Sequence, residues 1–349
     1  MAPDPFTVEP TADGSATFYS ETFGEWFHSR SGAYDEARST YVQATHLVER
    51  AQHQGRITIL DVCYGLGYNT AAALEGLWAV QPGLPIRLVG LELDATVPQA
   101  AIAQGLLKGW PEPVQSALQA IATDACSESL SQSSLISVLV ESPAIAAVVN
   151  EELVTHQIER SPFREGLKGI NRNTRLNLDT KTGANTARQT QLIANLLVGD
   201  ARQQIQTLVE QDFQADVIFL DPFSPPRCPQ LWTAEFLGSV ARCLHPQGIL
   251  ATYSCAAAVR TALTTAGLHI GSLATPGRRW PSTLASHTDT TLPPLSQQEQ
   301  EHLQTRAAVP YRDPSRQDDA ALIQQRRSQE QAQSPLQATG EWRRRWLSS

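Results

Sequence analysis

The sequence predicts an α/β protein built around a mostly parallel, doubly wound sheet. From Ile57 onward, short apolar runs alternate with stretches of helical character, the pattern of strand and helix units in such a sheet. The apolar run "ILDV" at 59–62 leads through Gly65 and Gly67 into a helix-like stretch, so the chain turns tightly from strand into helix. Several apolar runs also end on an acidic residue, which indicates a ligand site at one edge of the sheet.

The strands of this sheet are expected at short apolar runs bounded by polar or turn-forming residues: 57–62, 86–93, 194–200, 216–221 and 248–254. Helices are expected between them. One follows the glycine turn at 70–80, a second occupies 231–248 and ends at Pro246 and Gly248, and a third at 256–267 is closed by Gly267.

Three further segments flank or interrupt this core, which spans residues 51–286. Residues 1–50 are rich in aromatic and polar side chains and are expected to form a cap on the substrate side. The stretch of about 109–190 breaks the strand and helix rhythm, so it is interpreted as an insertion whose apolar front part is helical. After 286 the apolar runs give way to Gln, Ser, Arg and Glu, which predicts an extended or partly disordered tail over 287–349.

Composition narrows the class of protein. The chain has 349 residues with 41% hydrophobic content, enough for a sizeable core, and a formal charge of −8 that argues against general polyanion binding. Its five cysteines are odd in number, scattered and never in a Cys-x-x-Cys pair, so neither a disulfide framework nor a metal site is expected. Because the sequence contains neither a signal-like start nor a run long enough to span a bilayer, we expect a cytoplasmic protein without membrane contact.

The glycine turn indicates which ligand the sheet edge takes. A strand ending on Asp61, followed by Gly65 and Gly67, lets the backbone approach a ligand and directs helix N–H groups at it. The dinucleotide fingerprint calls for a third small residue where Thr70 stands, so NAD is disfavoured. A tight strand-to-helix connection without a ligand would produce the same two glycines.

Acids at three later strand ends extend this pattern. Glu92, with Asp94 as a near alternative, is placed to accept both hydroxyls of a ribose, and Asp200 to accept from an adenine amine, while Asp221 ends the strand beside the crevice. Each acid alone is commonly a turn former or helix N-cap. Together they favour S-adenosylmethionine, which carries cationic groups, over ATP, whose phosphates need basic residues and a Walker loop.

The motifs "DVCYGLGYN", "GLELD", "VGDAR", "FLDPFSP" and "LWTAEF" occur in an order that resembles class I S-adenosylmethionine-dependent methyltransferases, with their Rossmann-like sheet. More narrowly, the opening "TFYSETFGEWFHSRSGAYDEARSTYV" is similar to the methyltransferase half of the bifunctional tRNA-modification enzyme MnmC and its stand-alone form MnmD. The resemblance covers residues 17 to about 105 and 195–286.

The resemblance implies N-methylation of the 5-aminomethyl group of a uridine, often 2-thiolated, at wobble position 34 of tRNA. The implied cofactor is S-adenosylmethionine, held by Asp61, Gly65, Gly67, Glu92 and Asp200, and the implied partner is the tRNA anticodon loop. Asp221 is expected to orient the substrate amine and accept its proton, because a protonated amine has no lone pair for attack. We expect neither an FAD domain nor a metal in this chain, and a separate flavin-dependent or aminomethyl-forming enzyme acting upstream.

This sequence departs from the family pattern at three places. Cys63 stands where the first glycine of the cofactor loop is usual, the basic motif near 278–279 is matched only loosely, and the insertion is not part of the common core.

Aromatic residues near the motifs are candidates for contact with an extruded wobble base. Tyr19, Trp26, Phe223 and Trp232 supply rings for stacking, and His28 a polar contact, although a core role is the common alternative for each. Two basic stretches are candidates for phosphate contact. One is 160–188 in the insertion, for which a solvated surface loop is the alternative, and the other is "WRRRW" at 342–346, for which an exposed terminal helix is the alternative.

Two other functions remain open from sequence. One is methylation of a different amine, or methyl or aminopropyl transfer to a small molecule, on the same sheet. The other is a tRNA- or protein-binding module that keeps the fold without the cofactor, against which the full set of strand-end acids argues.

Overall fold

A computed structural model describes residues 6–124, 136–140, 190–274, 280–288 and 292–347. Its centre is an eight-stranded sheet in the order β10-β11-β9-β8-β4-β5-β7-β6. The five middle strands run parallel, whereas β6, β10 and β11 pair antiparallel with their neighbours. The strands are β4 (Ile57–Val62), β5 (Ile86–Glu92), β6 (Ile136–Val140), β7 (Thr190–Val198), β8 (Ala215–Leu220), β9 (Leu244–Thr252), β10 (His269–Leu273) and β11 (Ser282–Ser286). The predicted α/β class with a mostly parallel sheet is confirmed.

Alternating strand residues supply two cores, one on each face of the sheet. Ile59 of β4 joins the core beneath the helices nearest the N-terminus, whereas its neighbour Leu60 joins the opposite core, as the two-residue period of a strand requires. The first face is covered by α2 (Leu47–Gln54), α3 (Tyr68–Val80), α4 (Thr96–Ala103) and α5 (Glu112–Asp124). The second is covered by α7 (Ala201–Glu210), α8 (Ala234–Arg242) and α9 (Ala257–Thr265).

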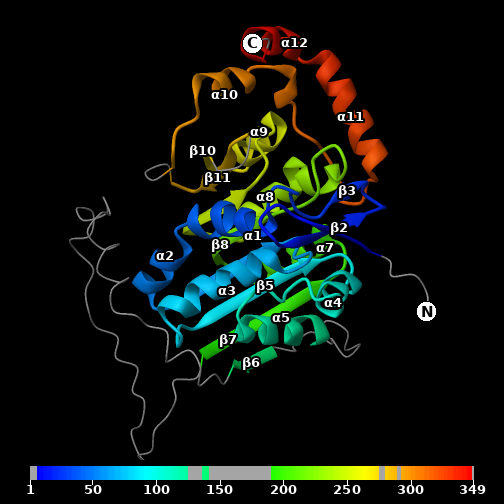
Figure 1. The fold of residues 1–349 in the computed structure, drawn as a ribbon. Helices are drawn as coiled ribbons and strands as arrows, with labels where there is room; N and C mark the ends of the chain where they lie inside the picture. Colours follow the sequence, from blue (N-terminus) through cyan, green and yellow to red (C-terminus); the bar gives the residue numbers. More distant parts are fainter. Residues whose placement is uncertain (1–5, 125–135, 141–189, 275–279, 289–291, 348–349) are drawn as a thin grey trace, which may run out of the picture.

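The N-terminal segment forms a small antiparallel sheet that lies beside the main one (Figure 1). Its strands are β1 (Thr7–Pro10), β2 (Ala16–Ser20) and β3 (Glu25–Trp26). The chain then enters α1 (Ala33–Glu36) and a π-helical turn, η1 (Ala37–Gln43), which packs on α3.

The predicted insertion is partly built into the fold. Helix α5 lies within the bounds expected for the insertion, yet it packs on the main sheet. The segment Ile136–Val140 was expected to be helical, but it forms the edge strand β6. That part of the prediction is wrong, because antiparallel pairing with β7 satisfies the backbone of this apolar run. The basic stretch 160–188 lies outside the described residues.

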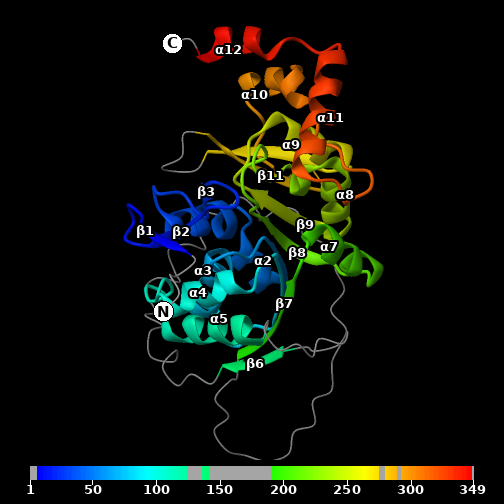
Figure 2. The ribbon, with the colours of Figure 1, turned by 90° about the vertical axis from the view of Figure 1, so that its right-hand side faces the viewer.

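The prediction of an extended tail is also wrong. Over 292–347 the chain forms α10 (Gln297–His302), a 3-10 turn η6 (Arg306–Ala308), α11 (Ala320–Gln333) and α12 (Thr339–Leu347). A capping box at Ser296 and Glu299 starts α10, and Asp319 caps α11. These polar helices are held by tertiary ion pairs, among them Arg260 to Glu299 at 2.8 Å, which composition alone does not reveal. Figure 2 shows the helices stacked beyond β11 and α9. None of the described helices is long and apolar enough to cross a membrane.

Candidate active site

The strand order reverses between β4 and β8. From β4 the chain proceeds to β5 and β7 on one side, and then returns to β8 and β9 on the other. Strands β4 and β8 pair directly, with Asp61 opposite Phe219 and Val62 opposite Leu220. Asp61 near the end of β4 and Asp221 just after β8 therefore lie at the switch point, where α/β sheets bind ligands.

The loop between β4 and α3 has the tight shape that the sequence predicted. Cys63, Gly65 and Gly67 all have left-handed backbones, with φ of 67°, 56° and 84°. A Cβ on Gly67 would lie 2.9 Å from the Tyr64 hydroxyl oxygen, so only glycine fits there. The positive φ at Cys63 explains why related loops favour glycine at this place, and a side chain there carries a strain cost.

Asp61 has an unsatisfied oxygen in the interior. The residue is fully buried, and its Oδ2 accepts a hydrogen bond of 2.7 Å from Thr70 Oγ1. Its Oδ1 has no partner among the described residues, and burial raises the pKa of this carboxyl well above its usual range. A buried oxygen without a donor is chemically suited to a ligand that brings one, and a cationic amine is the strongest such donor.

Glu92 ties the end of β5 to the glycine loop. Its Oε2 accepts from the Gly65 backbone N–H at 2.8 Å and its Oε1 from the Asp94 backbone N–H at 3.0 Å. Only 7% of the residue is exposed, and this burial raises the pKa of the carboxyl. Since a carboxylate can accept about four hydrogen bonds, Glu92 keeps acceptor capacity for a sugar hydroxyl.

Asp200 forms an ion pair with Arg202, a residue that the sequence analysis did not identify. Asp200 caps α7, and its carboxylate pairs with the Arg202 guanidinium at 2.7 Å. The same guanidinium reaches fully buried Asp313, from the tail, at 2.8 Å. Asp200 is thus fixed in place and partly neutralised, and adenine recognition by it stays a prediction.

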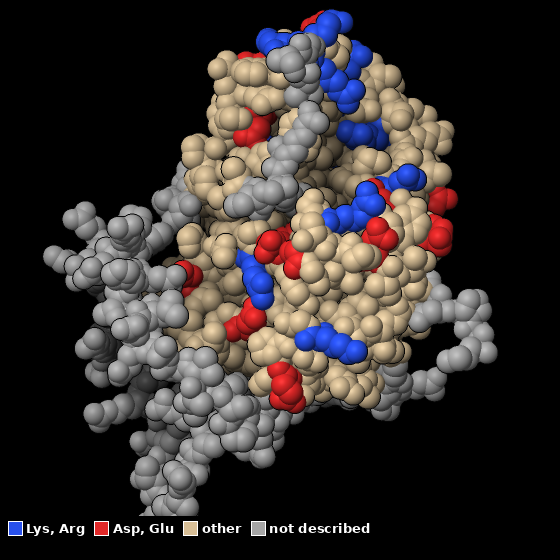
Figure 3. All heavy atoms as spheres, in the orientation of Figure 1, with Lys and Arg blue, Asp and Glu red and all other residues tan. Residues whose placement is uncertain are grey.

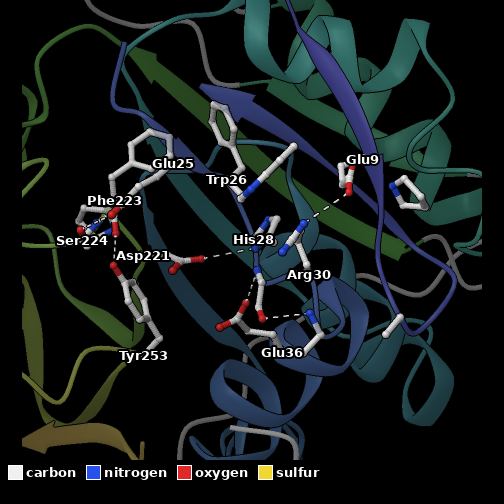
Figure 4. A pocket seen from close by; sticks show the side chains of 16 residues that line it. Glu9, Glu25, Trp26, His28, Arg30, Glu36, Asp221, Phe223, Ser224 and Tyr253 are labelled. Carbon is white, nitrogen blue, oxygen red and sulfur yellow. Dashed lines mark hydrogen bonds and ion pairs between the residues drawn. The ribbon is translucent and has the colours of Figure 1, made fainter. Parts of the chain in front are cut away.

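A cleft of about 800 Å³ opens between the N-terminal segment and the loop that follows β8. Figure 4 shows side chains from the two elements facing each other across it. It is lined by Glu9, Pro10, Ala12, Glu25, Trp26, Phe27, His28, Ser29, Arg30, Ser31, Glu36, Asp221, Pro222, Phe223, Ser224 and Tyr253. These include four acids against one arginine, so the cleft favours a cationic group.

Asp221 connects this cleft with the glycine loop. Its Oδ2 accepts a hydrogen bond of 2.8 Å from Asn69 Nδ2, at the first turn of α3, and lies 4.0 Å from His28 Nδ1. Burial lowers the pKa of His28, so the imidazole is neutral at pH 7 and the pair is a polar contact rather than an ion pair. Asn69 was not predicted as a site residue; its place two residues after Gly67, in the first turn of the helix, was the available signal.

The five predicted substrate contacts differ in position. Trp26, His28 and Phe223 line the cleft, whereas Tyr19 packs against the Trp26 ring with centroids 4.8 Å apart. Trp232 is fully buried, and its Nε1 donates to the Phe223 carbonyl at 2.8 Å. The expectation that Trp232 stacks on a base is therefore wrong: it is a core residue that fixes the backbone beside Asp221.

Glu25 joins the two walls of the cleft, a role that the sequence did not reveal. Its Oε2 accepts from the Ser224 backbone N–H at 2.9 Å, and its Oε1 accepts from the Ser224 hydroxyl. On the far side, the Tyr253 hydroxyl donates to the Pro222 carbonyl at 2.9 Å. The loop that carries Asp221 is therefore held from both sides.

Comparison with known proteins agrees with this geometry. Residues 165–288 match the family model of S-adenosyl-L-methionine-dependent methyltransferases. The crystal structure of MnmC2 from Aquifex aeolicus superposes on 95% of this chain and 87% of its own, with a TM-score of 0.66 and 28% identity. The chain therefore carries an S-adenosyl-L-methionine-dependent methyltransferase domain and is similar to MnmC proteins over about three quarters of its length.

Two curated relatives extend the match along the sequence. This methyltransferase is 27% identical over 263 residues to the tRNA 5-methylaminomethyl-2-thiouridine biosynthesis bifunctional protein MnmC of Acidovorax sp. (strain JS42), covering 75% of this chain and 32% of the relative. MnmC of Aromatoleum aromaticum is also 27% identical, over 267 residues, covering 76% and 33%. The methyltransferase thus spans about a third of the curated relatives that it matches. The predicted resemblance to the MnmC methyltransferase family and the predicted enzyme class, an S-adenosyl-L-methionine-dependent methyltransferase, are confirmed.

Proposed function

We propose that this methyltransferase transfers a methyl group to the 5-aminomethyl nitrogen of a wobble uridine, with or without 2-thiolation, in the anticodon loop of tRNA. The observation that carries the proposal is the acidic cleft that meets the switch point of the sheet at Asp221. A primary amine is cationic at neutral pH and is drawn to such a cleft. The names of the MnmC relatives supply the nucleoside.

The residues at the edge of the sheet fit S-adenosylmethionine. Asp61 has a buried oxygen without a partner among the described residues, which suits the amino group of the cofactor, and Glu92 keeps acceptor capacity for the ribose. Gly65 and Gly67 admit close backbone approach, and Asp200 borders the same rim. When bound, the cofactor supplies an electrophilic methyl group on a sulfonium, which is a good leaving group.

Within the cleft, the reaction depends on which groups accept the protons of the substrate amine. A nucleophilic amine needs a free lone pair, so its N–H groups must face acceptors and its extra proton must leave. The Asp221 carboxylate and the neutral His28 imidazole lie 4.0 Å apart and offer two acceptors to one amine. Asn69 holds the Asp221 oxygen through its 2.8 Å hydrogen bond, which orients the carboxylate for this contact.

The wobble base itself would contact aromatic rings at the mouth of the cleft. Trp26 and Phe223 line it from opposite walls, and unpaired anticodon bases are commonly recognised by stacking. Phe23 backs the Phe223 ring, with centroids 4.5 Å apart, and thereby limits its motion.

The test is methylation in vitro with labelled S-adenosylmethionine. The substrates are tRNA that carries 5-aminomethyl-2-thiouridine, the same tRNA with unmodified uridine, and free small amines. We expect label in the first alone, recovered as 5-methylaminomethyl-2-thiouridine by nucleoside mass spectrometry. Turnover of small amines without RNA would instead support a small-molecule methyltransferase, and lack of cofactor binding would support a binding module.

A further inference from the structure

The motif "WRRRW" at 342–346 is built into the tail by its two tryptophans. Trp342 is 5% exposed, stacks on His302 with ring centroids 4.0 Å apart, and donates from Nε1 to the Gln298 carbonyl at 2.9 Å. Trp346 donates from Nε1 to Glu301 at 2.8 Å. Both rings therefore fasten α12 to α10, and the aromatic residues of the motif are anchors rather than contacts for a base.

The three arginines of the motif fall into two groups. Arg345 pairs with Glu301 at 3.2 Å, so its charge is partly compensated within the tail. Arg343 and Arg344 are exposed and have no ion-pair partner among the described residues. A rigid, anchored helix thus presents two uncompensated guanidinium groups to solvent, in a protein whose overall charge is −8.

A third cation lies nearby. Arg306 is exposed in η6, and the backbone N–H of the next residue, Ala307, donates to the side chain of Thr339 at the start of α12, at 3.1 Å. Figure 3 shows basic side chains, all of them arginines in this part of the sequence, gathered over α12 and along α11, with few acidic side chains among them on this face. We call Arg306, Arg343 and Arg344 the tail cations.

The tail is also connected to the wall of the cleft. From α11, the Gln324 side chain donates to the Pro226 carbonyl at 2.7 Å, in the loop that begins at Asp221. In the stretch of the tail that precedes α11, Arg312 pairs with Glu235 of α8 at 2.7 Å. A partner bound on the tail cations would therefore be held at a fixed distance from the cleft.

We propose that the tail cations bind the phosphate backbone of the RNA whose base enters the cleft, so that the tail is a second RNA-binding surface apart from the reaction site. The proposal rests on the proposed function for the identity of the RNA. The acidic cleft favours the amine but repels phosphates, so the affinity for a polyanion has to come from elsewhere. Arginine suits this role because its planar fork binds phosphate oxygens in pairs.

The test compares the unsubstituted protein with the double variant Arg343→Gln/Arg344→Gln. The matched control is Arg56→Gln/Arg87→Gln, which removes the same charge from two exposed arginines outside the tail, at the amino ends of the central strands β4 and β5. tRNA affinity is measured by filter binding from 50 to 200 mM salt. Because each lost phosphate contact lowers the slope of log affinity against log salt by about 0.9, the variant slope should be shallower by about 2. Over this range the wild type should lose about tenfold more affinity than the variant.

Kinetics separate this surface from the reaction site. We expect the variant to raise KM for tRNA about tenfold while kcat at saturating tRNA and the Kd for S-adenosylmethionine stay at wild-type values. The charge reversal Arg343→Glu/Arg344→Glu should give a larger KM effect, with circular dichroism confirming that α12 is intact. Equal salt slopes for variant, control and wild type would overturn the proposal, and so would a wild type that does not bind tRNA. If tRNA binds with the expected slopes but is not methylated, the proposed function fails and this surface stands.

Discussion

The substitution Asp61→Asn should weaken cofactor binding without impairing folding. Asp61 is fully buried, and one carboxylate oxygen bonds Thr70 while the other has no partner among the described residues. Asp61→Asn keeps the shape and an acceptor for Thr70 but removes the charge that a cationic amino group would meet. A hydrogen bond to a charged group contributes about 1.5 to 3 kcal/mol, so we expect the Kd for S-adenosylmethionine to rise about 10- to 150-fold.

The same substitution should stabilise the ligand-free protein at neutral pH. Burial raises the pKa of Asp61 well above the ordinary value of 3.8, so the folded state holds this proton more tightly than the unfolded state does. The free energy of unfolding therefore falls as pH rises between the unfolded and the folded pKa. Asparagine does not titrate, so the variant escapes this loss and should melt at a higher temperature than the wild type at pH 8.

Isothermal calorimetry and thermal melts without ligand measure the two effects. Asp216→Asn is the matched control, because Asp216 is buried near the amino end of the central strand β8, away from the carboxyl end that Asp221 follows, and accepts from the Thr58 backbone N–H at 2.8 Å. It should leave the Kd for S-adenosylmethionine unchanged. An Asp61→Asn variant that binds within twofold of the wild type would refute the assignment of the unpartnered oxygen to the cofactor.

Three further substitutions address the cleft. Asp221→Asn should lower kcat by about 10² to 10⁴ with an unchanged Kd for S-adenosylmethionine, measured by single-turnover methylation; a loss below threefold would contradict its role. Burial lowers the pKa of His28, so the unfolded state takes up the proton first and stability is lost as pH falls from 6.5 toward the folded pKa. Urea unfolding between pH 7.5 and 5 should show less of this loss in His28→Gln, and an equal loss would mean that other groups cause it. Trp232→Phe removes the donor to the Phe223 carbonyl and should cost about 1 to 3 kcal/mol of unfolding free energy without changing the Kd for the cofactor, whereas a loss of cofactor binding would place Trp232 in that site.

The sequence alone determined the parts of this protein that depend on local backbone chemistry. A strand that ends on Asp61, two glycines that must adopt positive φ, and acids at successive strand ends each leave a signal within a few residues. Because parallel strands end at the same edge of a sheet, these local signals also predict that the acids converge. The left-handed backbone at Cys63 shows that even the departure from the usual glycine preserved the loop.

Only the tertiary structure decided features that join residues distant in sequence. Trp232 is a core residue because other elements bury it, and a polar tail becomes ordered because Asp313 meets Arg202 and Glu299 meets Arg260. His28 is neutral because burial, not its neighbours in the chain, sets its pKa. Periodicity and composition report what a segment can bury by itself, whereas burial, charge compensation and the contact with Asp221 depend on which other segment arrives beside it.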